Sequence, residues 1–256
     1  MEKGSIVGSI DTAQVVLYVF WVFFAGLIFY LRREDKREGY PLVSDRGGGV
    51  NVIGFPTPPS PKIFRLAHGH GTVSAPGPRA EPALNNARPV APWPGAPLEP
   101  TGNPMLDAIG PGAYALRSET PDLTVDGDVK IVPMRVATTF FVCASDPDPR
   151  GMTVIAADRA VAGTVKDVWV DRSEVIIRYY EVETVGGKRV LLPANFSRVD
   201  RSRGTIKVNS ILADQFADVP GIKNPDQITL REEDQICAYF GGGTLYATPG
   251  RAEPRL

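Results

Sequence analysis

The sequence is poor in the residues from which metal centres and nucleophilic active sites are built. It holds two cysteines and two histidines. Cys143 and Cys237 have no partners at metal-ligand spacing. We therefore interpret both cysteines as small, partly buried apolar side chains. The histidines occur in His68-Gly69-His70-Gly71, a loop that could hold a metal. No cysteine or acidic ligand is close in sequence, and hydrogen bonding within a turn is therefore favoured.

Motifs of catalysis and nucleotide binding are also missing. No serine lies in a Gly-x-Ser-x-Gly elbow, and no Gly-x-Gly-x-x-Gly opens a helix. The 28 basic and 29 acidic side chains nearly cancel, and no sustained basic patch carries interleaved aromatic residues. We therefore expect neither an enzyme nor a nucleic-acid-binding protein. A membrane-tethered hydrolase has no nucleophile–base pair to support it.

One long apolar run is present. It extends from Ala13 to Leu31 with a single polar side chain, Gln14, and a charged cluster follows over residues 32–38. As a helix it spans about 28 Å, close to the thickness of a bilayer's hydrocarbon core. Acidic residues before the run argue against a secretory signal, and its all-round apolar surface argues against a soluble core helix. We predict one membrane helix over residues 12–31.

Basic residues predict the orientation of this helix. Arg32, Arg33, Lys36 and Arg37 closely follow the span, whereas Lys3 alone precedes it. The positive-inside rule then places residues 1–11 outside the cell membrane and everything from residue 32 onward in the cytoplasm.

Proline and glycine dominate the segment that follows the helix. Fifteen prolines fall between Pro41 and Pro111, a density that opposes regular helix and most sheet pairing. Scattered apolar residues such as Phe55 and Trp93 distinguish the segment from a low-complexity linker. We predict an extended, irregular stretch over residues 32–129 that lies on the surface of another protein.

The remaining residues, 130–256, have the texture of a small β-domain. β-branched and aromatic runs predict strands over residues 134–143, 152–157, 162–171, 175–184, 189–193 and 205–208. Gly186-Gly187 is a hairpin signal, and short strands at this spacing suggest a small barrel. Thr229 and Glu232 form a capping box for one helix over about 230–240, which we expect to stop at Gly241.

Two groups of carboxylates are candidates for moving protons. Alternation along one strand places Glu181 and Glu183 on the face of Ile177 and Tyr179. A carboxyl in such a partly buried place should have a raised pKa and could pass protons near neutral pH. The same pattern is expected if the strand reaches the protein surface at this point and both glutamates are exposed to solvent.

The second group is an acidic stretch before the β-domain. Glu119, Asp122, Asp126 and Asp128 have no Lys or Arg among them. Such a cluster could collect protons from the cytoplasm, or it could be a solvated loop.

Several segments, taken in order, are highly specific together. They are Phe24-Ala25-Gly26-Leu27-Ile28-Phe29-Tyr30-Leu31, Arg37-Glu38-Gly39-Tyr40-Pro41-Leu42, Pro61-Lys62, Pro76-Gly77-Pro78, Pro100-Thr101-Gly102-Asn103-Pro104-Met105, Gly110-Pro111, Lys166-Asp167-Val168-Trp169-Val170-Asp171, Glu181-Val182-Glu183, Leu191-Leu192-Pro193 and Glu232-Glu233-Asp234-Gln235-Ile236-Cys237. On these the chain resembles the H subunit of the photosynthetic reaction centre of purple bacteria, almost end to end.

The resemblance implies one membrane helix and a cytoplasmic PRC-barrel domain, in the inner (intracytoplasmic) membrane. It implies a subunit that binds no cofactor itself and caps the L and M subunits. Those partners hold the bacteriochlorophylls, bacteriopheophytins, non-haem iron and quinones, and a cytochrome subunit and light-harvesting antenna are further candidate partners. The implied role is to stabilise the complex, shield the quinone sites and assist proton transfer to the secondary quinone.

The resemblance also implies site residues. The family's proton path uses the first glutamate of the Glu-Val-Glu motif, here Glu181, and we expect Glu183 as an outer member. Where some members carry surface histidines as proton entry points, this chain has Asp126 and Asp128.

The end of the span lies near bound lipid in this family, which makes Tyr30, Arg32 and Arg33 candidate headgroup contacts. The alternative for the whole chain is a single-pass membrane adaptor that uses its PRC-barrel to bind proteins outside photosynthesis.

Overall fold

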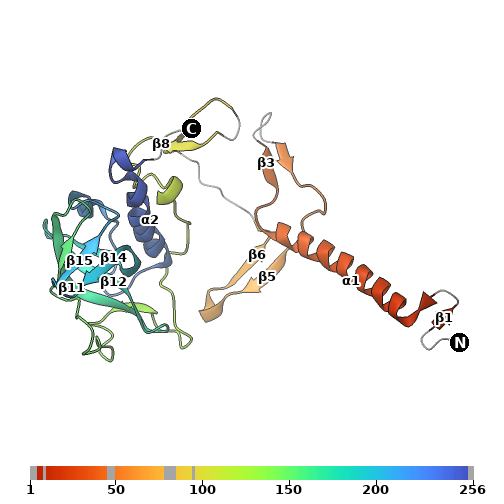
Figure 1. Ribbon diagram of the computed structural model, residues 1–256, viewed down its shortest axis with the longest axis horizontal. Helices are drawn as coiled ribbons and strands as arrows, with labels where there is room; N and C mark the ends of the chain where they lie inside the picture. The colour runs from red at the N-terminus through yellow and green to blue at the C-terminus, as the bar shows by residue number, and fades with distance from the viewer. Residues whose placement is uncertain (1–4, 8–9, 45–49, 78–84, 94–95, 253–256) are drawn as a thin grey trace. The chain divides into compact units, whose positions relative to one another are not determined.

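The structure, a computed structural model, describes residues 5–7, 10–44, 50–77, 85–93 and 96–252 (Figure 1). The chain divides into two compact units. The first comprises Met1–Ala83 and Trp93–Gly95, and the second comprises Leu84–Pro92 and Ala96–Leu256.

The first unit is built on one long helix, α1 (Thr12–Glu34). Asp11 caps its first turn by accepting a hydrogen bond from the backbone N–H of Gln14 at 2.8 Å. No residue of α1 is buried, and within the described residues it is the one helix long and apolar enough to cross a membrane. An apolar helix over the predicted residues is confirmed, and it continues three residues beyond Leu31 because Arg32, Arg33 and Glu34 are good helix formers.

Short hairpins precede and follow α1 in the chain. The elements are β1 (Ser5–Val7), β2 (Ile10–Asp11), η1 (Asp35–Arg37), β3 (Leu42–Ser44), β4 (Val50–Val52), β5 (Lys62–Arg65), η2 (Ala67–Gly69) and β6 (Thr72–Ala75). β1 pairs with β2, β3 with β4 and β5 with β6, all antiparallel. We did not expect this pairing among the prolines; segments of three or four proline-free residues are long enough for two-stranded ribbons. His68 and His70 lie at the β5–β6 turn and are exposed.

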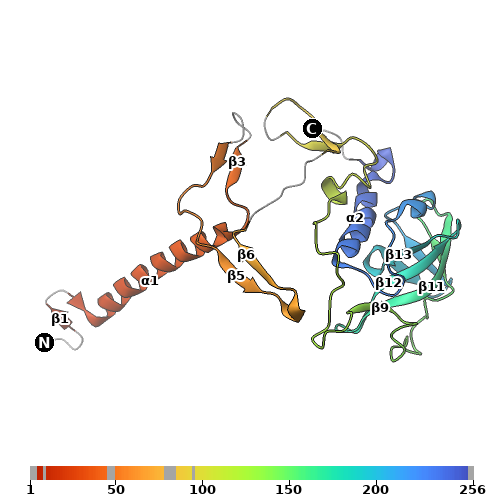
Figure 2. The ribbon, with the colours of Figure 1, turned by 180° about the vertical axis from the view of Figure 1, so that it is seen from behind.

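The second unit contains a seven-stranded sheet (Figures 1 and 2). Its elements are β7 (Ala87–Pro89), β8 (Leu98–Pro100), η3 (Gly110–Gly112), β9 (Ile131–Pro133), β10 (Thr153–Ile155), β11 (Val161–Asp171), β12 (Ile176–Thr184), β13 (Arg189–Pro193), η4 (Ala194–Phe196), β14 (Ser197–Asp200), β15 (Thr205–Val208), η5 (Asp214–Asp218), α2 (Leu230–Tyr246) and η6 (Pro249–Arg251). β7 and β8 form a separate ribbon. The sheet order is β13-β12-β11-β10-β15-β14, with β9 also on β11. Only the β10–β15 pair in this sheet is parallel among the described strands.

Most predicted strands are confirmed, including the hairpin at Gly186-Gly187, where Gly187 has a φ of +81°. The strand predicted over residues 134–143 is wrong. After β9 the chain leaves the sheet in a series of turns, in which Ala137 N–H donates to Pro133 O at 3.0 Å. β9 and β14 were not predicted, since each is a short edge segment.

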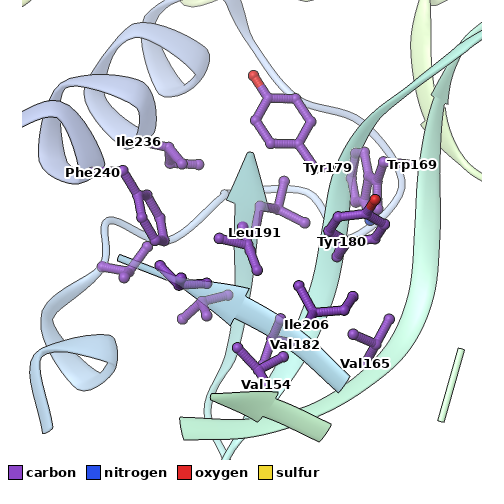
Figure 3. Close-up of a cluster of buried hydrophobic side chains, with 14 of the residues drawn as sticks. Val154, Val165, Trp169, Tyr179, Tyr180, Val182, Leu191, Ile206, Ile236 and Phe240 are labelled. Carbon is purple, nitrogen blue, oxygen red and sulfur yellow. The ribbon is translucent and has the colours of Figure 1, made fainter. Parts of the chain in front are cut away.

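Side chains of the sheet and of α2 form the core (Figure 3). Trp169, Leu192, Ile206, Ile236 and Phe240 are fully buried. Ile236 and Phe240 reach from α2 toward the strand residues, so the helix closes one side of the sheet. Residues before β9 also belong to this unit, because Leu230 N–H at the start of α2 donates to Thr120 O at 3.0 Å.

The capping box at the start of α2 is confirmed: Glu232 N–H donates to Thr229 Oγ1 at 3.2 Å and the Glu232 carboxylate accepts from Thr229 N–H at 2.9 Å. The predicted stop at Gly241 is wrong, since the helix continues to Tyr246. The glycines are packing positions. A Cβ on Gly243 would clash with Ile211 Cγ2 and lie 2.7 Å from Ser210 O, so only glycine lets the helix approach this segment.

Candidate functional site

Glu181 is a buried carboxylate in the middle of the sheet. It lies on β12 opposite Asp167 of β11 and Leu191 of β13, and it is 4% exposed. Its Oε2 accepts hydrogen bonds from Arg135 at 2.6 Å and from Trp169 Nε1 at 3.1 Å. Its Oε1 accepts one from Arg189 at 2.8 Å. The side chain is therefore neither solvated nor in an apolar pocket.

Arg135 links Glu181 to two further carboxylates. Its guanidinium donates to Asp167 Oδ2 at 3.0 Å and to Asp226 Oδ1 at 3.1 Å, and also to the Pro225 carbonyl. These partners come from β11 and from the segment before α2. We call Arg135, Asp167, Glu181, Arg189 and Asp226 the Glu181 cluster.

The electrostatics of this cluster correct one expectation. Burial alone would raise the pKa of Glu181, but hydrogen bonds from Arg135 and Trp169, with the charge of Arg135, hold that pKa below its ordinary value. The expected raised pKa is therefore wrong. Strand alternation indicated the burial but could not reveal the guanidinium, which comes from outside the strand.

A pocket adjoins the cluster. It has a volume of about 380 Å³ and is lined by Arg135, Glu181, Lys188, Arg189, Val190, Leu191, Pro220, Gly221, Ile222 and Pro225. Glu181 thus lies at the wall of a space large enough for several water molecules. The arrangement therefore places a buried carboxylate beside a space that water can occupy.

The outer candidate Glu183 has a different environment. It is half-buried on β12 and pairs with Lys166 at 2.7 Å. The hydrogen bond from Lys166 holds the pKa of Glu183 below its ordinary value.

Asp126 and Asp128 lie in an exposed loop before β9. Thr124 and Asp128 close this loop, with Thr124 N–H donating to Asp128 O at 2.7 Å. Both aspartates line a shallow depression together with Arg172 and Ser173. Within the described part of the chain, no hydrogen bond or ion pair joins either aspartate to Glu181 or Glu183. The structure therefore does not bring the two predicted groups into contact.

A second buried carboxyl was not predicted. Glu233 of α2 accepts a hydrogen bond from the Tyr179 hydroxyl at 3.2 Å, and Arg178 lies 4.0 Å away. Burial raises the pKa of Glu233, and burial likewise raises the pKa values of Tyr179 and Cys237 beside it. The burial of Glu233 could have been predicted from the helical periodicity. Glu233 precedes the core residues Ile236 and Phe240 by three and seven positions, which places it on the same face of α2.

The candidate lipid contacts lie at the end of α1. Tyr30, Arg32 and Arg33 are exposed. The next two basic residues make hydrogen bonds within the chain. Lys36 Nζ donates to Ile53 O at 2.9 Å, and Arg37 donates to Ser60 O at 2.9 Å and to Ala75 O at 2.7 Å.

No metal centre accompanies these groups: across the described ranges, no three His, Cys, Asp or Glu side chains come together as a metal site would require. The two cysteines are free; Cys143 is exposed and Cys237 is half-buried.

Comparison with protein families gives two matches. Residues 4–136, just over half of the chain, match the photosynthetic reaction centre H-chain N-terminal region. Residues 144–215 match the PRC-barrel domain, which corresponds to the sheet that carries Glu181. The chain therefore belongs to the photosynthetic reaction centre H-chain family, as a non-catalytic subunit with a PRC-barrel domain.

Proposed function

We propose that this subunit caps the L and M subunits of a reaction centre, shields their quinones from bulk water and assists proton transfer to the secondary quinone. The bacteriochlorophylls, bacteriopheophytins, quinones and non-haem iron belong to those partners, and a cytochrome subunit and antenna complete the assembly. The observation that carries this proposal is the buried, hydrogen-bonded Glu181 at the wall of a pocket.

A water-excluding cap must contain ionisable groups if protons are to reach a reduced quinone. In this chain Glu181 is held as an anion, because two arginines donate to it. Its two guanidinium partners offset that charge, so Glu181 assists passage as a hydrogen-bond acceptor for adjacent water and not as a proton store. Asp126, Asp128 and Glu183 act as outer groups that attract protons to the surface.

Glu233 complements this role. Burial raises the pKa of Glu233, which makes it better suited than Glu181 to hold a proton. Tyr179, which hydrogen-bonds Glu233, is two residues from Glu181 on the same face of β12. A storing group and a conducting group are thus carried by one strand and the helix that covers it.

The anchor sets the topology in this proposal. α1 spans the inner (intracytoplasmic) membrane once, with the N-terminus in the periplasm and the second unit in the cytoplasm. Tyr30, Arg32 and Arg33 contact lipid headgroups. The match of residues 4–136 includes the anchor and the proline-rich segment, which supports a reaction-centre subunit over an adaptor outside photosynthesis.

The test is Glu181→Gln in the assembled reaction centre. We expect slower flash-induced proton uptake with the second electron and an unchanged pigment spectrum, which reports assembly. Glu174→Gln, at an exposed glutamate before β12, is the matched control. Wild-type uptake in the Glu181 variant contradicts its role in proton transfer.

A further inference from the structure

The segment after β4 returns to the end of the membrane helix. The ring centre of Phe55 lies 5.8 Å from that of Phe29 on α1. Phe29 precedes Arg32 by three residues, which places it about 4–5 Å deeper than the first arginine along the helix. Phe55 therefore lies level with the apolar run and not with the charged cluster that follows it.

The segment is held there by a buried lysine. Lys36 is 2% exposed, and its ammonium donates to Ile53 O at 2.9 Å and lies 5.0 Å from the ring centre of Tyr40. Gly54, with a φ of +65°, lies so close that a Cβ there would be 3.3 Å from Lys36 Nζ. The position of Phe55 is thus fixed by contacts to the helix end.

The side chains of this loop are apolar and uncovered. Phe55 is 84% exposed, and Val52 and Ile53 beside it are also exposed. A single exposed aromatic residue is unremarkable. Here, however, the exposed group continues the uncovered apolar surface of α1, and such a continuous patch marks an interaction site.

Charged groups bound the patch on one side. Glu34 pairs with Arg37 at 2.9 Å and with Lys62 at 2.7 Å. Glu34 follows Phe29 by five residues, so these ions lie farther along the helix axis, beyond the apolar run. Aromatic residues on the apolar side of a charged boundary are typical of a membrane–water interface.

We propose that residues 52–56 form a second membrane anchor, in which Phe55 inserts among lipid chains beside the cytoplasmic end of α1. This rests on the proposed membrane span of α1. Lipid is the occupant that the continuity with α1 favours, because Phe29 and Phe55 present one uninterrupted aromatic surface.

Site-directed spin labelling tests this in the assembled complex in native membranes. Phe55→Cys is combined with Cys143→Ser and Cys237→Ala and labelled with a nitroxide. Relaxation by oxygen, which concentrates in lipid, is compared with relaxation by a water-soluble nickel chelate. Phe23→Cys reports the middle of the span, and Val185→Cys, at the exposed β12–β13 turn, reports water. The pigment spectrum verifies assembly.

We expect the oxygen-to-nickel accessibility ratio at position 55 to exceed one, as at position 23, and to fall below one at position 185. A ratio below one at position 55 with a high ratio at position 23 overturns the second anchor and leaves the span intact. A low ratio at both positions removes the span itself. Low accessibility of position 55 to both reagents means that a partner protein covers it, which also overturns the proposal. If the label at position 55 prevents assembly, Ile53→Cys carries the same expectations.

Discussion

Arg135 and Glu181 are 46 positions apart in sequence and meet at 2.6 Å. The arginine follows β9, outside the matched PRC-barrel region, and the glutamate lies inside that region. One guanidinium thereby joins the two matched parts of the chain at the site that we propose for proton transfer.

Removal of this arginine should destabilise the second unit. Arg135→Met leaves Glu181 and Asp167 buried with fewer donors, at a cost of about 2–3 kcal/mol, since unsatisfied buried charged groups are expensive and Arg189 compensates in part. Urea unfolding of the full-length chain in detergent, followed by circular dichroism, measures it. Arg150→Met, which removes an exposed pair with Asp148, should change the unfolding free energy by less than about 1 kcal/mol. Equal effects of the two variants would contradict the special role of Arg135.

Glu181 should make stability depend on pH in the acid range. Its folded-state pKa lies below the unfolded value, so the ionised group contributes stability above the unfolded pKa, and this contribution is lost as the pH falls through the folded pKa. Glu181→Gln should therefore be less stable than wild type at pH 7, with a deficit that shrinks as the pH falls below the unfolded pKa. A deficit independent of pH would show that the charge is not responsible.

Glu233 should make the stability depend on pH in the opposite direction. Its folded-state pKa is raised, so its contribution is present below the unfolded pKa and is lost as the pH rises through the folded pKa. Glu233→Gln keeps an acceptor for the Tyr179 hydroxyl and should gain stability relative to wild type as the pH rises above the unfolded pKa. Unfolding free energies over that range test this, and parallel curves for variant and wild type would refute it.

The glycines of α2 should differ in their tolerance of a methyl group. Gly243→Ala places Cβ against Ile211 and Ser210 O and should cost about 1–3 kcal/mol despite its better helix propensity. Gly241→Ala would place Cβ 3.3 Å from Pro111 O and 3.8 Å from Phe196 Cζ. Its effect should stay within about 1 kcal/mol, because the better helix propensity of alanine offsets the tighter contact. Chemical unfolding of both variants provides the comparison. A harmless Gly243→Ala would mean that the helix end does not need this close approach.

Lys36 should control the loop that follows β4. Lys36→Met removes the donor to Ile53 O and should increase the rate of protease cleavage within residues 50–56 several-fold in the purified complex. Arg65→Met, at an exposed residue of β5, should leave that rate unchanged. Unaltered cleavage in the Lys36 variant would show that other contacts hold the loop.

The features predicted correctly from the sequence are local ones. The helix over residues 12–31, the capping box of Thr229 and Glu232 and the turn at Gly186-Gly187 depend on neighbours within a few positions. The end of α2 was missed because Gly241 appeared to be a stop, whereas the helix continues and the close approach of Ile211 and Ser210 requires a glycine at position 243 inside it.

The sequence predicted the burial of Glu181 but not the direction of its pKa shift. Strand alternation indicates burial, but the sign of the pKa shift depends on Arg135 and Arg189, which reach the carboxylate across the fold. The prediction of a strand over residues 134–143 was wrong for a related reason. The β-branched and aromatic composition favours a strand, yet the backbone forms successive turns there, with Phe140 N–H donating to Ala137 O at 2.9 Å.

The contacts that residues before β9 make with the rest of the second unit limit how the protein can be truncated. Thr120 caps the start of α2 from outside the PRC-barrel match, and Arg135 neutralises Glu181 from outside it too. A recombinant fragment trimmed to residues 144–215 would lose the Arg135 donor to Glu181 and lack the helix that seals its interior. A fragment of the second unit should therefore start no later than about residue 96, where the continuous part of this unit begins.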